Sequence, residues 1–544
     1  MKKLRSNSGF TMIIFLALLL MLTLIGINSV MTSTVEVNIA GNEVNYMNSF
    51  YAAEAALEKA STEMAHAYRT TGAAPHPLPS GTLNLGRFAV TYTTTQTSAS
   101  ETKDLSNGTY RGLYALATPY EITATATAGG TETEATLVQG IECDLVPLFQ
   151  FAVFYENDLE IAPGPPMTLG GRVHSNGNLY LQSGNQLNID SYTSAAGNIF
   201  HGRKPGSGQS TSSGDVRIMD ANGTYQEMYD SGTWLDSTDP DWVAESISRW
   251  GGMVEDSDHG ITELELPVVS SGVPDNMIAT ATESADSYEN KATLKIIDGV
   301  ASYQQIDGSW IDVTAALIAE GSLTTNSFYD AHQGNTVNSW DIDMSNFKNS
   351  AYFPSNGIMY TANTTGGANL KATRLVNASD IGQPFTLSSR NSVYIQGDYN
   401  TVNKKPSAVM TDALTILSNN WNDANSSQPL SNRNASETTV NCSYMTGNQN
   451  TGEGGSAYNG GFENLPRFLE QWSGIDFNWM GSAVDLWLSK EANAPWSYGA
   501  YYTAPNRNWA FDEDLKDPTK LPPGTPLIAI MQKVSWMEKV VAEN

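Results

Sequence analysis

The chain has 544 residues, of which 40% are hydrophobic, and its 57 acidic and 29 basic side chains give a formal net charge of -28. A chain of this length is expected to form several hydrophobic cores. The negative charge disfavours nucleic acids and acidic substrates as partners. The sequence contains no H-E-x-x-H, G-x-x-x-x-G-K-[ST], G-x-S-x-G or G-x-G-x-x-G motif, which excludes the standard hydrolase and nucleotide-binding signatures.

Two cysteines limit the sulfur chemistry of the chain. Cys143 and Cys442 do not form a C-x-x-C pair, so a cysteine-based zinc site and a redox dithiol are both excluded. Two interpretations stay open. The thiols form one long-range disulfide in an oxidising compartment, or they are two isolated and buried free thiols.

An apolar helix is predicted next to the N-terminus. Three basic residues among the first five precede an uncharged stretch, whose centre at 10–30 reads FTMIIFLALLLMLTLIGINSV. At a rise of 1.5 Å per residue this segment spans roughly 31 Å, enough to cross the hydrocarbon core of a bilayer. No further basic residue occurs before Lys59. The charge asymmetry therefore predicts a cytoplasmic N-terminus and an exported remainder.

A cleavable secretory signal is the main alternative to a retained membrane helix. Its apolar region would be shorter, roughly 7 to 15 residues, and would end in a small-x-small cleavage site. The segment that follows, 32–69, instead continues as a helical pattern, and 51–60 is rich in good helix formers. We therefore expect one rod that begins in the membrane and emerges from it.

The residues at the start of this rod resemble a type IV prepilin leader. A short basic peptide ends at Gly9, and the apolar helix begins at Phe10. The segments V-E-V-N-I-A-G-N-E and F-Y-A-A-E-A-A-L-E-K-A are similar to the N-terminal region of PilX-type pilus assembly proteins. This resemblance implies that a prepilin peptidase cuts between Gly9 and Phe10 and methylates the new amine. It also implies that the partners are other pilin or pseudopilin subunits.

One position departs from the pattern of major pilins. Those proteins usually carry Glu at the fifth mature position, where this chain has Ile14. In the pilin family that acid neutralises the N-terminal amine of a neighbouring subunit, and a buried unpaired amine would be costly. Ile14 therefore argues against a repeating shaft subunit. It is typical of minor pilins and of the tip pseudopilin of type II secretion.

The exported region is predicted to be mainly β. Alternating runs at 86–95, 113–128 and 132–146 are rich in Val, Tyr, Ile and Thr and indicate a small antiparallel meander. By analogy with pilins, this meander would pack beside the long helix.

A different pattern begins after the meander. Short apolar runs recur every 6 to 12 residues between 158 and 200, and similar runs return between 385 and 420. Gly, Asn, Pro and Ser separate them, as in the stacked coils of a solenoid. We favour a right-handed parallel β-helix, with a β-sandwich as the alternative. Short helices at 241–250 and 311–320 and a hairpin at 301–310 indicate an insertion.

The predicted fold class is thus mainly β with a long N-terminal α-helix. In chain order, the predicted divisions are a leader (1–9), a transmembrane helix (10–31), a helix extension (32–70), a small antiparallel β domain (71–147), a β-helix-like domain (148–421) with an insertion at about 241–355, and an aromatic-rich C-terminal cap (422–544).

Two further patterns were weighed as binding sites. The aromatic residues between 487 and 509 have three interpretations: a surface that stacks on sugar rings, an anchor for a partner protein, or an ordinary local core. Two acidic triplets imitate the start of a calcium loop but lack the rest of an EF-hand, which favours surface turns. They are Asp341/Asp343/Ser345 and Asp220/Asn222/Thr224. Calcium stays without a location, and no other cofactor is predicted.

The sequence therefore predicts a non-enzymatic, membrane-anchored component of type IV pilus assembly, of the minor-pilin, tip or initiator kind. It would cross the bacterial inner membrane once and expose a large domain to a carbohydrate or protein ligand. Two alternatives are a membrane-tethered carbohydrate-active enzyme on a β-helix and a secreted adhesin with a cleaved signal peptide. Dozens of carboxylate and arginine combinations fit the first of these, so no catalytic residue is assigned.

Overall fold

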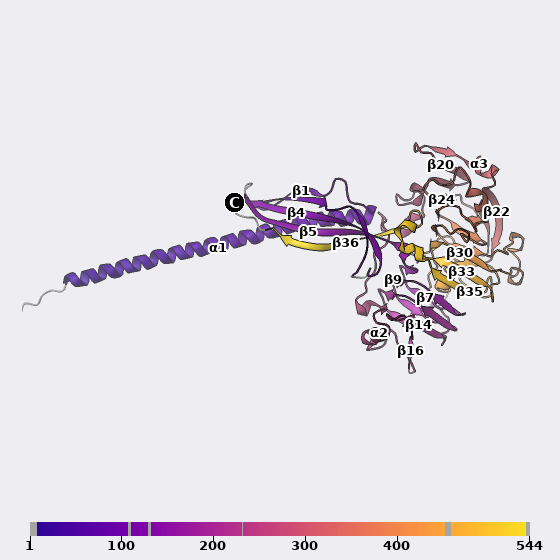
Figure 1. Cartoon of the computed structure of the whole chain (residues 1–544), viewed down its shortest axis with the longest axis horizontal. Coiled ribbons are helices and arrows are strands. Elements are labelled where there is room, and N and C mark those ends of the chain that lie inside the picture. Colours follow the sequence, from indigo (N-terminus) through magenta and orange to yellow (C-terminus); the bar gives the residue numbers. More distant parts are fainter. Residues whose placement is uncertain (1–7, 107–109, 129–131, 231, 452–457, 540–544) are drawn as a thin grey trace, which may run out of the picture.

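The computed structural model describes residues 8–106, 110–128, 132–230, 232–451 and 458–539. One long helix, α1 (Ser8–Thr71), projects freely over its first part and lies against a small sheet over its second part (Figure 1). A larger β-rich head follows at the far end of this sheet. Most of the leader, residues 1–7, lies outside the described residues.

The second half of α1 packs through small side chains. Ala53, Ala56 and Ala60 are fully buried and lie at three- and four-residue steps, so they occupy one face of the helix. Alanine at these positions lets the helix axis approach the sheet closely. Leu57, Met64 and Tyr68 are buried in the same core, whereas Met47 is 42% and Tyr51 57% exposed.

The small sheet is antiparallel and has the order β1-β2-β4-β5-β36, with β3 pairing β4. The meander predicted from the sequence is confirmed, and the structure adds a distant strand, β36, at the edge beside β5. The strands are β1 (Ser80–Leu85), β2 (Phe88–Gln96), β3 (Glu101–Asp104), β4 (Tyr114–Ala128), β5 (Glu132–Pro147) and β36 (Leu527–Glu538).

Alternation explains how this sheet binds the helix. In β4, Ile122, Ala124 and Ala126 are buried while the residues between them are less so, because successive side chains point to opposite faces. These residues share one core with the alanine face of α1. Two buried polar contacts connect helix and sheet: Ser61 Oγ donates to Gln139 Oε1 at 2.9 Å, and the Tyr68 and Tyr120 hydroxyls lie 2.9 Å apart.

The first half of the head consists of very short strands and one helix. They are β6 (Val153–Tyr155), β7 (Leu159–Ile161), β8 (Met167–Leu169), β9 (Val173–Ser175), β10 (Leu179–Leu181), β11 (Gln186–Ile189), β12 (Thr193–Ala195), β13 (Ile199–His201), β14 (Asp215–Met219), β15 (Tyr225–Glu227), β16 (Tyr229–Asp230), β17 (Thr233–Trp234), α2 (Trp242–Trp250) and β18 (Val254–Glu255).

The second half has longer strands. They are β19 (Leu294–Ile297), β20 (Val300–Gln304), β21 (Trp310–Asp312), α3 (Thr314–Ala319), β22 (Leu323–Asp330), β23 (Asn335–Asp343), α4 (Met344–Phe347), β24 (Ile358–Ala362), β25 (Leu370–Val376), β26 (Phe385–Ser389), β27 (Ser392–Gln396), β28 (Ser407–Thr411), β29 (Leu414–Leu417), β30 (Thr438–Asn441), β31 (Ser443–Thr446), β32 (Pro466–Phe468), β33 (Asp476–Gly481), β34 (Ala483–Asp485) and β35 (Asn506–Phe511).

The head is one continuous stack that the chain enters in the middle. Its largest sheet has the order β18-β12-β9-β6-β34-β31-β28-β26-β24-β19-β20-β21, and every pair from β18 to β19 is parallel. The chain therefore moves outward from β6 to β18, crosses to the opposite end at β19, and returns to β34. The two halves join where β34 pairs β6 and β35 pairs β8.

The first coils repeat every 20 residues. The Asn178 main-chain N–H donates to Asp158 Oδ1 at 2.8 Å, and the Asn198 N–H donates to Asn178 Oδ1 at 2.9 Å, each across a separation of 20 residues. Asn and Asp side chains thus cap the backbone of the next coil at the same corner. Gly177 and Gly197 precede this corner, and a Cβ on either would lie within 3 Å of the coil below.

Two predicted regions differ from the structure. The region after 422 does not form a cap, because β34 and β35 lie inside the stack and β36 belongs to the small sheet. The proposed insertion at 241–355 also contributes to the stack, since β19 and β23 pair in parallel with β24 and β25. Its predicted local elements are nevertheless present as α2, α3 and the β20–β21 hairpin.

We predict that Gly197→Ala destabilises the head. An added Cβ would lie 2.5 Å from Asn178 Oδ1 and 2.9 Å from the Gly177 carbonyl oxygen, both in the stacked coil. Overpacking of this kind costs about 1–3 kcal/mol. Urea unfolding of the full chain in detergent measures the loss. Gly366→Ala is the control because its Cβ would meet nothing within 4 Å; equal unfolding free energies in the two variants would contradict the stacked-corner argument.

Candidate functional site

The first candidate site is the free part of α1. All of residues 9–44 are exposed, and an 18-residue window in this helix has a mean hydropathy of 2.8 with none of it buried. The helix is long and apolar enough to cross a membrane by length and composition. Phe10 is 69% and Ile14 45% exposed on this part, so neither contacts the folded body.

Small and hydroxylated residues of the free helix share this exposure. Thr23, Gly26 and Ser29 lie at three-residue steps, and Thr23 Oγ1 donates to the Leu19 carbonyl at 2.6 Å, which satisfies its hydroxyl within the helix. A Cβ placed on Gly26 or Gly9 would meet nothing within 4 Å. Both glycines are therefore open to a second molecule.

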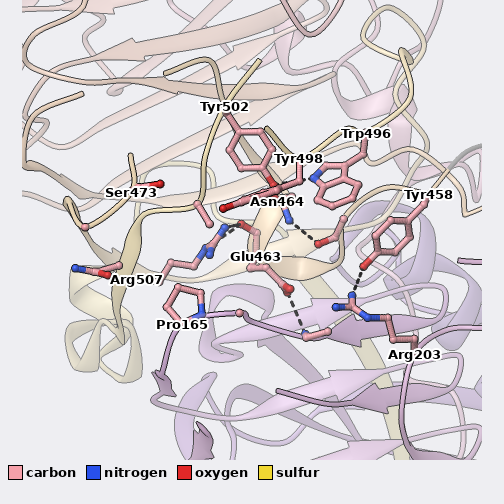
Figure 2. A pocket seen from close by; sticks show the side chains of 16 residues that line it. Pro165, Arg203, Tyr458, Glu463, Asn464, Ser473, Trp496, Tyr498, Tyr502 and Arg507 are labelled. Carbon is pink, nitrogen blue, oxygen red and sulfur yellow. Dashed lines mark hydrogen bonds between the residues drawn. The ribbon is translucent and has the colours of Figure 1, made fainter. Parts of the chain in front are cut away.

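A second candidate site is a cavity of about 410 Å³ at the joint between the two halves of the head. Early coils contribute Pro165 and Arg203, and late segments contribute Tyr458, Trp496 and the other labelled aromatic rings (Figure 2). The remaining lining residues are Ala162, Gly164, Gly460, Glu463, Asn464, Ser473, Gly474, Tyr498, Tyr502, Ala504, Asn506 and Arg507.

Polar contacts fix the walls of this cavity. Glu160 is buried and accepts a hydrogen bond from Arg203 Nη1 at 3.0 Å, and it also accepts from the Tyr458 hydroxyl. On the opposite wall, Arg507 donates to the Glu463 carbonyl oxygen through Nε at 3.1 Å and Nη2 at 2.9 Å. Both guanidinium groups therefore have acceptors of the protein itself. Arg203 forms an ion pair with Glu160, whereas the acceptor of Arg507 is a neutral main-chain oxygen.

Glu463 connects the two halves directly. Its Oε2 accepts a hydrogen bond from the Ala162 N–H at 3.2 Å, so a late side chain binds the backbone of an early coil. Burial raises the pKa of the Glu463 carboxyl to about 7, although Arg507 acts in the opposite direction. The group is thus protonated over part of the neutral range.

Most of the aromatic cluster that the sequence singled out is core. Trp487, Tyr501, Tyr502 and Trp509 are buried, with exposed fractions of 7% or less. Tyr498 differs, since 58% of it is exposed at the mouth of the joint cavity. The sequence pattern indicated the segment 487–509 as a candidate binding site, but only the structure separates its exposed ring from the buried ones.

A third candidate is a cavity of about 380 Å³ that contains carboxylates beside a cation. Arg390 donates through Nη2 to Glu283 at 2.9 Å and forms an ion pair with Glu491 at 3.4 Å. Asp412 accepts from the Ser489 hydroxyl and from the backbone of Lys490. Sequence reasoning did not name these residues, because they come from separate coils and share no local motif.

The two cysteines lie in different cores. Cys143 is buried on β5 beneath α1, and Cys442 is buried between β30 and β31 in the head. Both are free thiols, and burial raises the pKa of each to about 12. The structure does not bring them together as a disulfide. It corresponds to the alternative of two isolated thiols.

The acidic triplets act as turn caps. Asp220 Oδ1 accepts from the N–H groups of Asn222 and Thr224, both at 2.9 Å. Asp343 accepts from the Ser345 N–H at the start of α4, while Asp341 pairs with Arg374. Within the described ranges, no group of three or more His, Cys, Asp or Glu side chains is placed to hold a metal ion.

Comparisons with known proteins add one similarity. No family model matches the chain, and no curated protein matches it. Among solved structures, the chain is similar to the competence-associated pilin ComZ from Thermus thermophilus, with 10% identity and a TM-score of 0.22. The match covers 90% of this chain and 96% of that one. A TM-score this low does not establish a shared fold.

We predict that Glu463 makes stability depend on pH. Its carboxyl titrates near pH 4.3 when unfolded and at about 7 when folded. The folded state therefore holds the proton more tightly, and the stability linked to it is complete below about pH 4.3 and lost above about pH 7. Denaturant titrations at pH 5 and pH 7.5 measure how far the free energy of unfolding falls as the pH rises. This fall should be smaller for Glu463→Gln than for the wild type.

The control for this experiment is Glu101→Gln on the exposed strand β3, which changes formal charge equally. It should keep the wild-type decrease. An unchanged decrease in Glu463→Gln would show that the joint carboxyl does not contribute to the pH dependence.

Proposed function

We propose that the protein is a pilin-related assembly component of the minor-pilin, tip or initiator kind, anchored in the bacterial inner membrane. The single observation that supports this most is the division of α1. One face of its second half is fixed to the small sheet, while its first half is apolar and entirely exposed. Each large apolar side chain gains about 1.5–3 kcal/mol on burial. The free half therefore needs lipid or other apolar helices around it.

The leader and the topology belong to the same proposal. Basic residues before the helix would hold the N-terminus in the cytoplasm, and the sheet and head would be exported. A prepilin peptidase would cut between Gly9 and Phe10, both of which lie on the exposed surface of α1. The Gly9–Phe10 bond lies in the first turn of the helix Ser8–Thr71, whereas removal of the whole apolar segment as a signal peptide would cut in the middle of this helix; the continuous helix therefore favours retention of the anchor.

The role of an accessory subunit is supported by Ile14. The residue is apolar and exposed where a shaft subunit would carry an acid. Without that carboxylate, this chain cannot neutralise the amine of the subunit that precedes it. A position at the end of a filament avoids the need, since a tip subunit has no predecessor.

We further infer that the stacked parallel strands of the head form a β-helix, and right-handedness stays a prediction. A β-sandwich is built from antiparallel sheets, whereas the pairs from β18 to β19 are parallel. The head would serve as a large exported surface for interaction.

The proposal includes no catalysis and no cofactor, with calcium left open. Carboxylates of the third cavity are held by Arg390 and by backbone N–H groups, which favours a structural role over an enzymatic one.

The processing step is tested by mass. In cells that contain a prepilin peptidase, the wild-type chain should lose its first nine residues and gain a methyl group at Phe10. Gly9→Leu should block the cut, because the enzyme would meet a bulky side chain before the scissile bond. Intact-mass analysis of purified protein distinguishes the products. Gly41→Leu, another open glycine of α1, should be processed normally; identical N-termini in the wild type and Gly9→Leu would remove the processing claim.

Assembly is tested by helix packing in the membrane. Association of helices in lipid depends on close approach at small residues, so Gly26→Leu should lower recovery of the protein in sheared filament fractions several-fold. Ala17→Leu is the matched control, because nine residues at 100° per residue place it on the opposite side of the helix. Immunoblots of both variants measure the effect. Equal recovery would contradict a packing role for the Gly26 face.

A further inference from the structure

The joint cavity has features of a binding site that the assembly role does not explain. Its volume of about 410 Å³ lies in the range of roughly 300–1,000 Å³ in which proteins bind small molecules. It is built only when early and late parts of the chain come together. Hydrogen bonds from Tyr458 to Glu160 and from Ala162 to Glu463 join the two segments around the cavity.

Aromatic rings form one wall of this cavity. Tyr498 is 58% exposed and Trp496 is partly exposed, and their ring centroids lie 6.0 Å and 6.4 Å from that of Tyr502 (Figure 2). Trp496 Nε1 donates to the Tyr502 hydroxyl at 2.8 Å, so the indole is held in one orientation. Exposed rings that are held in this way offer flat apolar surfaces. Flat C–H faces of pyranose rings stack on such surfaces.

Glycines at the base of the wall keep the indole in place. Gly460 and Gly461 have φ values of 87° and 76°, a conformation that other residues rarely adopt. A Cβ on Gly460 would lie 2.5 Å from Trp496 Nε1 and 2.7 Å from Asn464 Nδ2. The close approach of this backbone to Trp496 therefore defines the shape of the cavity.

Polar side chains complete the lining. Asn464, Ser473 and Asn506 contribute amide and hydroxyl groups to the lining. Asn464 bonds the Gly460 carbonyl and the Tyr502 hydroxyl, and Asn506 Nδ2 donates to Asp476 Oδ1. Each amide keeps a second N–H and a further lone pair, so the group can still donate to and accept from sugar hydroxyls. Of the two cations, Arg203 is neutralised by the Glu160 carboxylate, and Arg507 is hydrogen-bonded to the neutral Glu463 carbonyl oxygen. The net charge of -28 also repels acidic ligands. A neutral ligand with many hydroxyl groups matches this combination.

We propose that the joint cavity binds a neutral saccharide, with one or two pyranose rings against Trp496 and Tyr498 and hydroxyl groups bonded by the amide and hydroxyl side chains opposite. This binding site goes beyond the assembly role. The proposal does not depend on that role, because the cavity lies in the head and not on α1. It gives the exported head a ligand class: uncharged glycan, rather than acidic polysaccharide or peptide.

The test uses the full chain in a detergent without a sugar headgroup, such as lauryldimethylamine oxide. Cellotetraose, chitotetraose and maltotetraose are the neutral probes, and tetragalacturonate is the acidic one. Calorimetric titration should show that at least one neutral tetrasaccharide binds more tightly than tetragalacturonate. Absence of neutral binding at concentrations up to about 10 mM, the range of the weakest specific affinities, would overturn the proposal, as would tighter binding of the acidic probe.

Variants locate the binding. Loss of one stacked ring weakens binding by about threefold to tenfold, so Tyr498→Ala should show this loss and Tyr498→Phe should stay near the wild type. Gly460→Ala should also weaken binding because Trp496 must move. Tyr229→Ala removes another exposed tyrosine, 44% accessible and remote in sequence, and should bind normally. Equal losses of affinity in Tyr498→Ala and Tyr229→Ala would overturn the saccharide assignment. It would also be overturned if a casein peptide digest bound, lost affinity in Tyr498→Ala, and no sugar bound.

Discussion

The pairing of β5 with β36 is the constraint on which the rest of the structure depends. The two strands are antiparallel neighbours from Leu137 opposite Glu538 to Pro147 opposite Leu527. Because β5 leads into the head and β36 leads out of it, the whole head is an insertion in the edge of the small sheet. Cys143 of β5 and Ala529 of β36 both belong to the core beneath α1. The head is thus fixed to the rod through two hydrogen-bonded strands rather than through a flexible linker.

The rod itself combines two different surfaces in one regular helix. Where it meets the sheet, alanine side chains provide a narrow contact face and allow close packing. Where it is free, Leu, Ile, Met and Phe cover all sides, which is typical of a helix that lies in lipid. No break separates the two parts between Ser8 and Thr71. A displacement of the free half would therefore be transmitted along the helix to the sheet and, through β5 and β36, to the head.

Local sequence patterns predicted the local elements well. Period-two alternation placed β2, β4 and β5 to within a few residues, and the short apolar runs matched β7, β8, β10 and β11. The dipeptide Gly177-Asn178 recurs at Gly197-Asn198, and this spacing alone predicts the length of one coil. β12 has no large apolar residue and is recognisable only from its register with β9.

Long-range features could not be predicted for a physical reason. The pairing of β36 with β5, and of β34 with β6, joins segments at opposite ends of the chain and leaves no periodic trace in either. The joint cavity has the same origin, since Arg203 and Trp496 reach it from different halves. The sequence indicated that the aromatic segment mattered, but its division into core and exposed rings depends on which coil each ring meets.

The central entry of the chain into the stack has a consequence for the order of folding. β6 and β8 are among the first strands of the head to emerge during synthesis, yet their partners β34 and β35 are among the last. Until the final coils arrive, one flank of the nascent stack keeps unsatisfied N–H and C=O groups, a state that invites aggregation. Such a topology requires a period of protection until the last coils are in place, so maturation of this molecule should depend on chaperones more strongly than its stability alone suggests.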